Sequence, residues 1–291
     1  MLKDFISTVL EEEMQVYGIV VLQDGVTKAE HHFALEERRN LYSATKCITS
    51  TAVGMAIAEG YFRLEDSILP FFEQELSGSV SEEQRKRLEQ ITIERLLTMS
   101  IVDYPFERLS CDHWLEHILS IPLPNIGLRK FRYNNFTSYL AGVIVEKSTG
   151  MPILKFLEQR LFEPLGISSV TCAYSPEGYY YGSTGMKLTV KELSRIGQLY
   201  LQQGSYEGRQ LLPREWVRQA TKKQIENKEL GYGYYFWRQE HNTYCARGKW
   251  GQICMVIPDK NAVIAVLSNL VEEELEEKLQ HSLWDTIYPR L

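Results

Sequence analysis

Segments typical of β-strands occur near both ends of this 291-residue chain. Near the start, YGIVVL (17–22) is followed by Asp24-Gly25, a strong two-residue turn signal, and by a return segment from Val26 to Phe33. Near the end, the segments expected to be strands are GYGYYFW (231–237), the stretch around Cys245, QICMVI (252–257) and AVIAVL (262–267), the last two joined at Pro258–Asn261. Strands this far apart in the sequence form one sheet only if the chain between them is accommodated elsewhere.

The middle of the chain has the pattern of helices. Apolar residues recur at helical spacing in ITIERLLTM (91–99), DHWLEHIL (112–119), FTSYLAGVIVEKSTG (136–150) and ILKFLEQRLFEPLG (153–166). Amphipathic helices are also expected at residues 4–14 and around Leu275 to Ile287. The pattern predicts an α+β fold, an antiparallel β-sheet flanked by terminal helices with an inserted mainly helical domain. We expect a sheet domain of residues 1–60 plus 175–291 and a helical domain of residues 61–174, with the active site between them.

Ser43-Ala44-Thr45-Lys46 is an S-x-x-K pattern where a long helix is expected to begin, with Gly60 as its stop. Residues three apart lie on one helical face, so the lysine nitrogen can reach the serine hydroxyl. Lysine acts as a base at pH 7 only if burial or a nearby positive charge lowers its pKa. The backbone N–H of Ser43, in the first turn, can also stabilise an oxyanion. Taken alone, the pattern fits a serine N-cap followed by an exposed lysine better than it fits a catalytic pair.

Two further motifs bear on the same chemistry. Tyr133-Asn134-Asn135 precedes a helical segment, and a tyrosine near a lysine can relay a proton. Asn135 could hold Lys46 or a substrate amide. The segment from Ala246 to Gln252 enters a strand, and glycines in an edge strand let a substrate carbonyl approach the backbone. Alone, each motif also fits an ordinary turn or hairpin.

In this order and at these separations, the three motifs resemble those of the class C β-lactamase-like serine hydrolases. That family includes penicillin-binding proteins, D-amino-acid peptidases, esterases and amide hydrolases. The resemblance extends over roughly residues 15–270 and includes longer segments as well as the motifs. These segments are IERLLTM (93–99), FRYNNFTSYLAGVIVEKSTG (131–150), FLEQRLFEPLGI (156–167), STGMKLTVKELSRIGQLYLQQGSYEGRQLLPREW (183–216) and GYGYYFW (231–237). The fold of the family agrees with the pattern of strands and helices described above.

The resemblance implies acyl transfer at a serine. Ser43 would be the acylated nucleophile, Lys46 its general-base partner and Tyr133 the tyrosine that relays protons. Asn135 would be the asparagine of the Y-x-N motif. The second oxyanion donor would be the backbone N–H of Lys249, the residue after Gly248. The expected substrate is a small-molecule ester, amide or peptide, and the mechanism requires no metal and no organic cofactor.

The third motif departs from the family. Where β-lactamases and penicillin-binding proteins have K-T-G or a close variant, this chain has Ala246-Arg247-Gly248. The lysine that helps recognise a β-lactam carboxylate is therefore absent, although the guanidinium of Arg247 suits a carboxylate. Trp250 could wall an acyl pocket or simply pack. We therefore favour an ester or amide hydrolase, with a β-lactam-binding or β-lactamase-type protein and a catalytically quiet binding protein as alternatives.

A competing pattern is His113-x-x-Glu116-His117, which matches the H-x-x-E-H motif of inverted zinc proteases. The family resemblance already accounts for this helical region, so we expect no metal site there. No G-x-S-x-G elbow occurs in the sequence, which leaves an α/β-hydrolase triad unsupported.

Charge and composition restrict the partners. The net charge is −6 and no basic run occurs, so nucleic acid and anionic membranes are not expected partners. The first residues lack the features of a signal peptide, and no apolar stretch is long enough to span a bilayer. Five cysteines without a pairing pattern suit reduced thiols. We therefore expect a cytoplasmic protein, whose oligomeric state the sequence does not determine.

Overall fold

The computed structural model describes residues 1–76, 80–107 and 109–291. Its largest sheet has six strands in the order β2-β1-β10-β9-β8-β7, and each neighbouring pair is antiparallel. These strands are β1 (Val16–Gln23), β2 (Val26–His32), β7 (Trp237–Arg238), β8 (Tyr244–Gly248), β9 (Gln252–Ile257) and β10 (Ala262–Ser268). The pairing of β1 with β10 joins the two ends of the chain, which confirms the predicted sheet.

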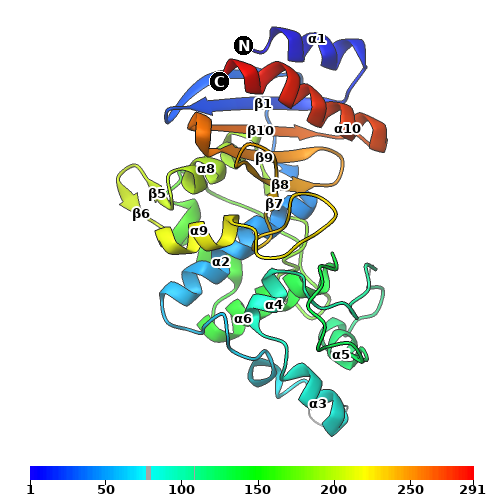
Figure 1. The fold of residues 1–291 in the computed structure, drawn as a ribbon. Helices are drawn as coiled ribbons and strands as arrows, with labels where there is room; N and C mark the ends of the chain where they lie inside the picture. The colour runs from blue at the N-terminus through cyan, green and yellow to red at the C-terminus, as the bar shows by residue number, and fades with distance from the viewer. Residues whose placement is uncertain (77–79, 108) are drawn as a thin grey trace.

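The sheet has two buried faces because successive side chains of a strand point to opposite sides. Ile19 and Val21 contribute to the core on one face, and Val20 and Leu22 to the core on the other. The first face is covered by α1 (Lys3–Glu11) and α10 (Glu273–Ser282), with both termini close by (Figure 1). The terminal helices thus flank the sheet as predicted.

The other face of the sheet packs on α8 (Val190–Leu201), and the helical part of the chain lies beyond it (Figure 1). The central element is α2 (Thr45–Ala58), which is buried from Thr45 to Ala56. The helix is therefore buried on all sides, and it packs against α6 (Phe136–Thr149). This enclosure places the first turn of α2 deep beneath the surface.

The remaining elements are short. The helices are α3 (Glu82–Leu88), α4 (Ile93–Leu97), α5 (Trp114–Ser120), α7 (Ile153–Leu157) and α9 (Arg214–Thr221). The small two-stranded sheets pair β3 (Arg39–Asn40) with β4 (Lys187–Leu188) and β5 (Ser205–Tyr206) with β6 (Arg209–Gln210). The limits expected for the two domains stay a prediction.

One predicted strand is largely wrong. In GYGYYFW only Trp237 lies in a strand of the sheet. Tyr235 has a φ of 66°, a left-handed value that breaks an extended strand, and a Cβ on Gly233 would lie 2.1 Å from the carbonyl oxygen of Ala220. The segment therefore turns and packs closely on the end of α9 instead of extending.

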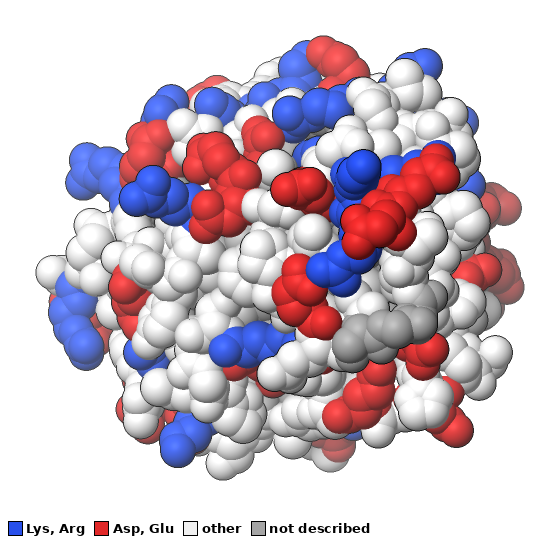
Figure 2. All heavy atoms as spheres, turned by 90° about the horizontal axis from the view of Figure 1, so that it is seen from below, with Lys and Arg blue, Asp and Glu red and all other residues white. Residues whose placement is uncertain are grey.

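The face at the helical end of the molecule carries charged side chains of both signs among other residues (Figure 2). Lysine and arginine side chains alternate there with aspartate and glutamate, so no broad area of one sign covers this face (Figure 2). Within the ranges that the structure describes, none of the helices combines the length and the hydropathy needed to cross a bilayer.

Candidate active site

A cleft of about 820 Å³ opens where the start of α2 meets the end of β8. Six of the eight predicted site residues line it, namely Ser43, Tyr133, Asn135, Arg247, Gly248 and Lys249. Lys46 lies beneath its floor with 1% of its surface exposed. The three sequence motifs, which are up to about 200 residues apart in the chain, therefore meet at one place.

Ser43 lies in a tight 3-10 turn, Tyr42–Ala44, just before α2. The helix proper begins at Thr45, two residues later than the sequence predicts. Tyr42 has a φ of 46°, and its N–H donates to the side-chain oxygen of Asn40 at 2.8 Å, which holds this turn. The strained turn leaves Ser43 partly exposed at the floor of the cleft instead of capping the helix.

Lys46 is surrounded by neutral partners. Its Nζ lies 3.2 Å from Ser43 Oγ, 2.9 Å from Asn135 Oδ1 and 3.1 Å from the backbone oxygen of Ser183. Burial disfavours the charged form and lowers the pKa of Lys46 to about 7. At neutral pH a substantial share of the molecules therefore carries an uncharged amine next to the serine.

Tyr133 approaches the same pair from the loop before α6. Its ring centre lies 5.0 Å from Lys46 Nζ, and its hydroxyl shares a hydrogen bond with Ser43. Burial raises the pKa of Tyr133 to about 12, although the hydrogen bond to Ser43 and the charge of Arg247 act in the opposite direction. The phenol is therefore protonated at neutral pH.

Asn134 and Asn135 join the Tyr133 loop to α6. Asn134 is buried, and its side-chain oxygen accepts the N–H of Thr137 at 2.9 Å, which satisfies an unpaired donor of the helix start. Asn135 is thereby fixed with its Oδ1 on Lys46.

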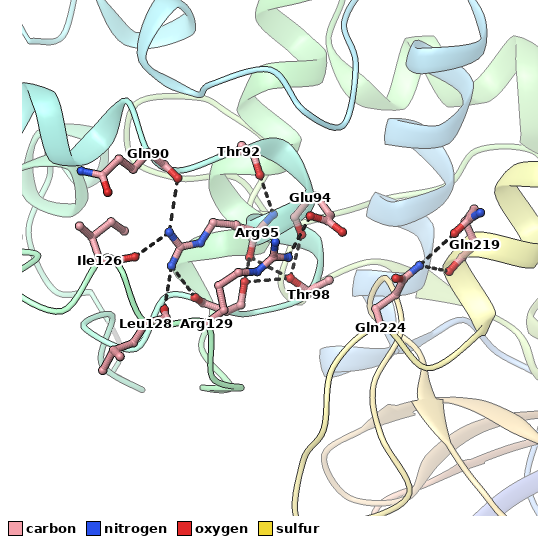
Figure 3. Close-up of polar contacts among 11 residues, drawn as sticks. Gln90, Thr92, Glu94, Arg95, Thr98, Ile126, Leu128, Arg129, Gln219 and Gln224 are labelled. Carbon is pink, nitrogen blue, oxygen red and sulfur yellow. Dashed lines mark hydrogen bonds and ion pairs between the residues drawn. The ribbon is translucent and has the colours of Figure 1, made fainter.

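Arg95 on α4 fixes the loop that leads to Tyr133. It is 6% exposed and donates hydrogen bonds to four backbone oxygens (Figure 3), which belong to Gln90, Ser100, Ile126 and Leu128. Ser100 lies at the start of the segment between α4 and Tyr133, and Leu128 lies near its end. The Arg95 guanidinium therefore ties the two ends of this segment together. Arg132 N–H adds a bond to the oxygen of Met99 at 2.8 Å.

The end of β8 presses against the turn that carries Ser43. A Cβ on Gly248 would lie 2.1 Å from the Leu41 carbonyl oxygen and 3.1 Å from the Ala44 nitrogen, so this approach requires a glycine. Lys249 follows at the rim of the cleft and is exposed. Trp250 does not line the cleft; its ring packs edge-on against Tyr42 at 4.8 Å.

Comparison with known proteins agrees with this architecture. The sequence matches the family model described as beta-lactamase over residues 10–285. The chain belongs to the β-lactamase family. Among solved structures, a class C β-lactamase from Rhodobacter sphaeroides superposes with a TM-score of 0.77 at 14% identity, with 98% of this chain and 98% of that chain covered. An octameric penicillin-binding protein homologue from Pyrococcus abyssi gives 0.76 at 18% identity, with 99% and 77% covered.

A curated relative of this β-lactamase-family chain is the 6-aminohexanoate-dimer hydrolase of Paenarthrobacter ureafaciens. It is 22% identical over 231 residues, which are 71% of this chain and 57% of the relative. The chain therefore spans a little over half of the length of that relative.

Some residues of the site were missed by the sequence analysis. The carbonyl oxygen of Ser183 holds Lys46, and Ser183 Oγ donates to the backbone oxygen of Asn135 at 2.6 Å. Trp237 lines the cleft with its ring 5.4 Å from that of Tyr133. Both residues lie within segments that resemble those of the β-lactamase family. The backbone contact of Ser183 has no residue-type signature, and the position of the Trp237 ring depends on tertiary packing.

The residues of the H-x-x-E-H pattern lie at the start of α5. His117 Nε2 lies 3.5 Å from a carboxylate oxygen of Glu107, and His113 precedes the first residue of α5. In residues 1–76, 80–107 and 109–291, no three His, Cys, Asp or Glu side chains lie close enough together to hold a metal ion.

Proposed function

We propose that this protein is a serine hydrolase that cleaves an ester or amide through an acyl-enzyme on Ser43. The observation that supports this most directly is the burial of Lys46 beside the serine hydroxyl, where its hydrogen-bond partners are neutral. A lysine with a pKa of about 7 is both sufficiently neutral to accept a proton and basic enough to retain it at physiological pH.

In the first step, Ser43 Oγ forms a bond to the substrate carbonyl carbon while its proton passes to Lys46 Nζ. The carbonyl oxygen becomes an oxyanion, for which the backbone N–H groups of Ser43 and Lys249 are the proposed donors. One such donor typically contributes about 3–4 kcal/mol to transition-state stabilisation. The close approach of Gly248 to the Ser43 turn supports this pairing of donors.

Collapse of the intermediate breaks the bond to the leaving group, which takes a proton. Tyr133 is the proposed donor, because it is protonated at neutral pH and hydrogen-bonded to Ser43. Lys46 restores the proton to Tyr133. Water then attacks the acyl carbon while Lys46 removes one of its protons. The bond from the carbon to Ser43 Oγ breaks, Lys46 returns the proton to Oγ, and the acid product leaves.

The catalytically quiet alternative is less well supported, because a buried lysine next to a partly exposed serine is unfavourable for folding and has no evident structural benefit. The β-lactam alternative is also weaker. Arg247, the candidate carboxylate binder, already contacts a carboxylate of the protein itself, Glu229, at 2.6 Å.

Intact-mass spectrometry tests the proposal. A fluorophosphonate probe should add one adduct to the wild type and none to Ser43→Ala, whereas Ser7→Ala, on the far face of the sheet, should be labelled as the wild type is. Turnover should then be measured on p-nitrophenyl esters, a linear amide such as a 6-aminohexanoate dimer, and a penicillin. Absence of any adduct and of any turnover would rule out the acyl-enzyme, and a stable penicillin adduct without ester turnover would favour the β-lactam alternative.

A further inference from the structure

The guanidinium of Arg247 reaches the cleft with most of its binding capacity already used. One nitrogen donates to both carboxylate oxygens of Glu229, at 2.6 and 2.8 Å. Another donates to Gln280 Oε1 at 3.2 Å, and the group lies 4.3 Å above the ring of Trp237. Three segments, the loop before β7, β7 itself and α10, thus hold one arginine.

The loop that carries Glu229 is itself fixed. The side-chain oxygen of Asn227 accepts the N–H groups of Glu229, at 2.9 Å, and of Gly231, at 2.8 Å. Gly231 has a φ of 110°, and a Cβ there would lie 2.3 Å from the Lys223 side chain, so the turn needs glycine. Glu229 is therefore presented to Arg247 by a preformed turn.

We propose that Glu229 determines the charge preference of the cleft: by occupying Arg247, it disfavours substrates that carry a carboxylate near the scissile carbonyl. The inference rests on the proposed acyl transfer at Ser43 and adds the substrate class, neutral esters or amides. A substrate carboxylate would have to displace a carboxylate that the chain holds in place.

The physical argument is a competition between two anions for one cation. The intramolecular partner has a high effective concentration because its turn is preformed. With Glu229 in place, the pair presents almost no net charge to the cleft, so Arg247 adds little long-range attraction for an anionic substrate. Replacing the carboxylate by an amide of the same shape frees the cation without removing any apolar contact.

The experiment compares two esters of similar length, p-nitrophenyl butyrate and the mono-p-nitrophenyl ester of glutaric acid, which differs by a terminal carboxylate. The wild type should prefer the neutral ester in kcat/KM. In Glu229→Gln the ratio of anionic to neutral kcat/KM should rise by about two- to fivefold, the range of a partly exposed charge pair. The gain should shrink at 1 M salt because salt screens such a contact.

Two controls isolate the effect. Glu226→Gln removes a carboxylate from the same loop that pairs with Lys223 instead, and it should leave the ratio unchanged. Adding Arg247→Gln to Glu229→Gln should abolish the gain. If Glu229→Gln folds poorly, Glu229→Ser is the substitute variant. It removes the carboxylate and places a small polar residue in this exposed loop.

The outcomes separate the two proposals. An unchanged ratio in a folded Glu229 variant that hydrolyses the neutral ester would overturn the role of Glu229 and leave the acyl-transfer mechanism intact. If the wild type hydrolysed neither ester and took up no fluorophosphonate, the underlying function itself would fail. A wild type that already preferred the anionic ester would also overturn the inference.

Discussion

Lys46 Nζ lies 3.2 Å from Ser43 Oγ and donates to the oxygens of Asn135 and Ser183, which can only accept hydrogen bonds. A neutral amine has two hydrogens and one lone pair. The two acceptors take the hydrogens, so the lone pair is directed at the serine hydroxyl. These contacts suit the proposed role of the nitrogen as the base for Ser43, and burial makes the neutral form accessible.

The first prediction is a pH dependence. Because only neutral Lys46 can accept the proton, kcat/KM on p-nitrophenyl butyrate should rise with pH through about 7, with the slope of a single deprotonation. It should then stay level at higher pH, because the nitrophenolate leaving group needs no proton from Tyr133. Asn135→Asp places a negative charge beside Lys46 Nζ and so raises the pKa of the lysine. The rise in kcat/KM should therefore move to higher pH. A coincident profile for the two proteins would contradict this assignment.

A second prediction concerns stability. The pKa of Lys46 is 10.5 in the unfolded chain and about 7 in the folded protein, so between these values the unfolded state binds more protons. Stability from this group is therefore fully present above pH 10.5 and is lost as the pH falls to about 7. Lys46→Met lacks this dependence. Between pH 7 and 10.5, the free energy of unfolding of the wild type should increase relative to that of Lys46→Met by a few kcal/mol.

Urea unfolding of both proteins at several pH values measures this difference, because other groups titrate equally in both and cancel. Lys46→Met should be catalytically inactive while being relatively more stable at pH 6 than at pH 10. A difference in unfolding free energy that does not vary with pH would show that Lys46 is not buried in its neutral form.

The contribution of Tyr133 to kcat should depend on how strongly the leaving group needs a proton. Tyr133→Phe should lower kcat by about 10²–10⁴-fold on an alkyl ester or amide. The loss should be much smaller on a p-nitrophenyl ester, because nitrophenolate leaves without protonation. Trp237→Phe, which alters the neighbouring ring and no proton donor, is the matched control. Equal losses on both kinds of substrate would assign Tyr133 a structural role.

Much of the arrangement could be predicted from sequence because it follows from spacing and periodicity. The apolar, β-branched runs YGIVVL and AVIAVL, with the Asp24-Gly25 turn, predict strands that the structure contains. Ser43 and Lys46 lie within one turn, so their contact is local. Tyr133 and Asn135 are brought to them by tertiary packing, and only the resemblance to a family placed them there in advance.

What could not be predicted depends on backbone atoms and on long-range pairs of common residues. The carbonyl oxygen of Ser183, which orients Lys46, is shared by every residue type. The pairing of Arg247 with Glu229 crosses 18 positions and depends on the turn at Asn227. GYGYYFW has high β propensity, yet the packing of Gly233 on α9 overrides it.

Arg95 provides a prediction about positioning. Arg95→Met removes four hydrogen bonds to buried or partly buried carbonyls and should lower the free energy of unfolding by at least about 2 kcal/mol. It should also lower kcat more than it raises KM, since the Tyr133 loop loses its anchor. Arg129→Met, an exposed neighbour that pairs with Glu94, should have little effect.

A purely structural Arg95 can be distinguished by non-additivity. If Arg95 acts by placing Tyr133, then Tyr133→Phe should lower kcat less in the Arg95→Met background than in the wild type. Full additivity of the two losses, measured on an alkyl ester with both variants folded, would indicate that Arg95 supports the fold alone.

Gly248→Ala tests whether the end of β8 takes part in the chemistry. The new Cβ would lie 2.1 Å from the Leu41 carbonyl oxygen, so the strand must move away from the Ser43 turn. Overpacking of this kind costs about 1–3 kcal/mol of stability. Displacing Lys249 N–H from the oxyanion should lower kcat by about 10²–10³-fold even for a p-nitrophenyl ester, whose leaving group needs no proton.

Gly127→Ala, whose Cβ would meet nothing within 4 Å, should change neither thermal stability nor turnover by a comparable amount. Wild-type kcat in a destabilised Gly248→Ala would mean that the oxyanion donors lie elsewhere in the cleft.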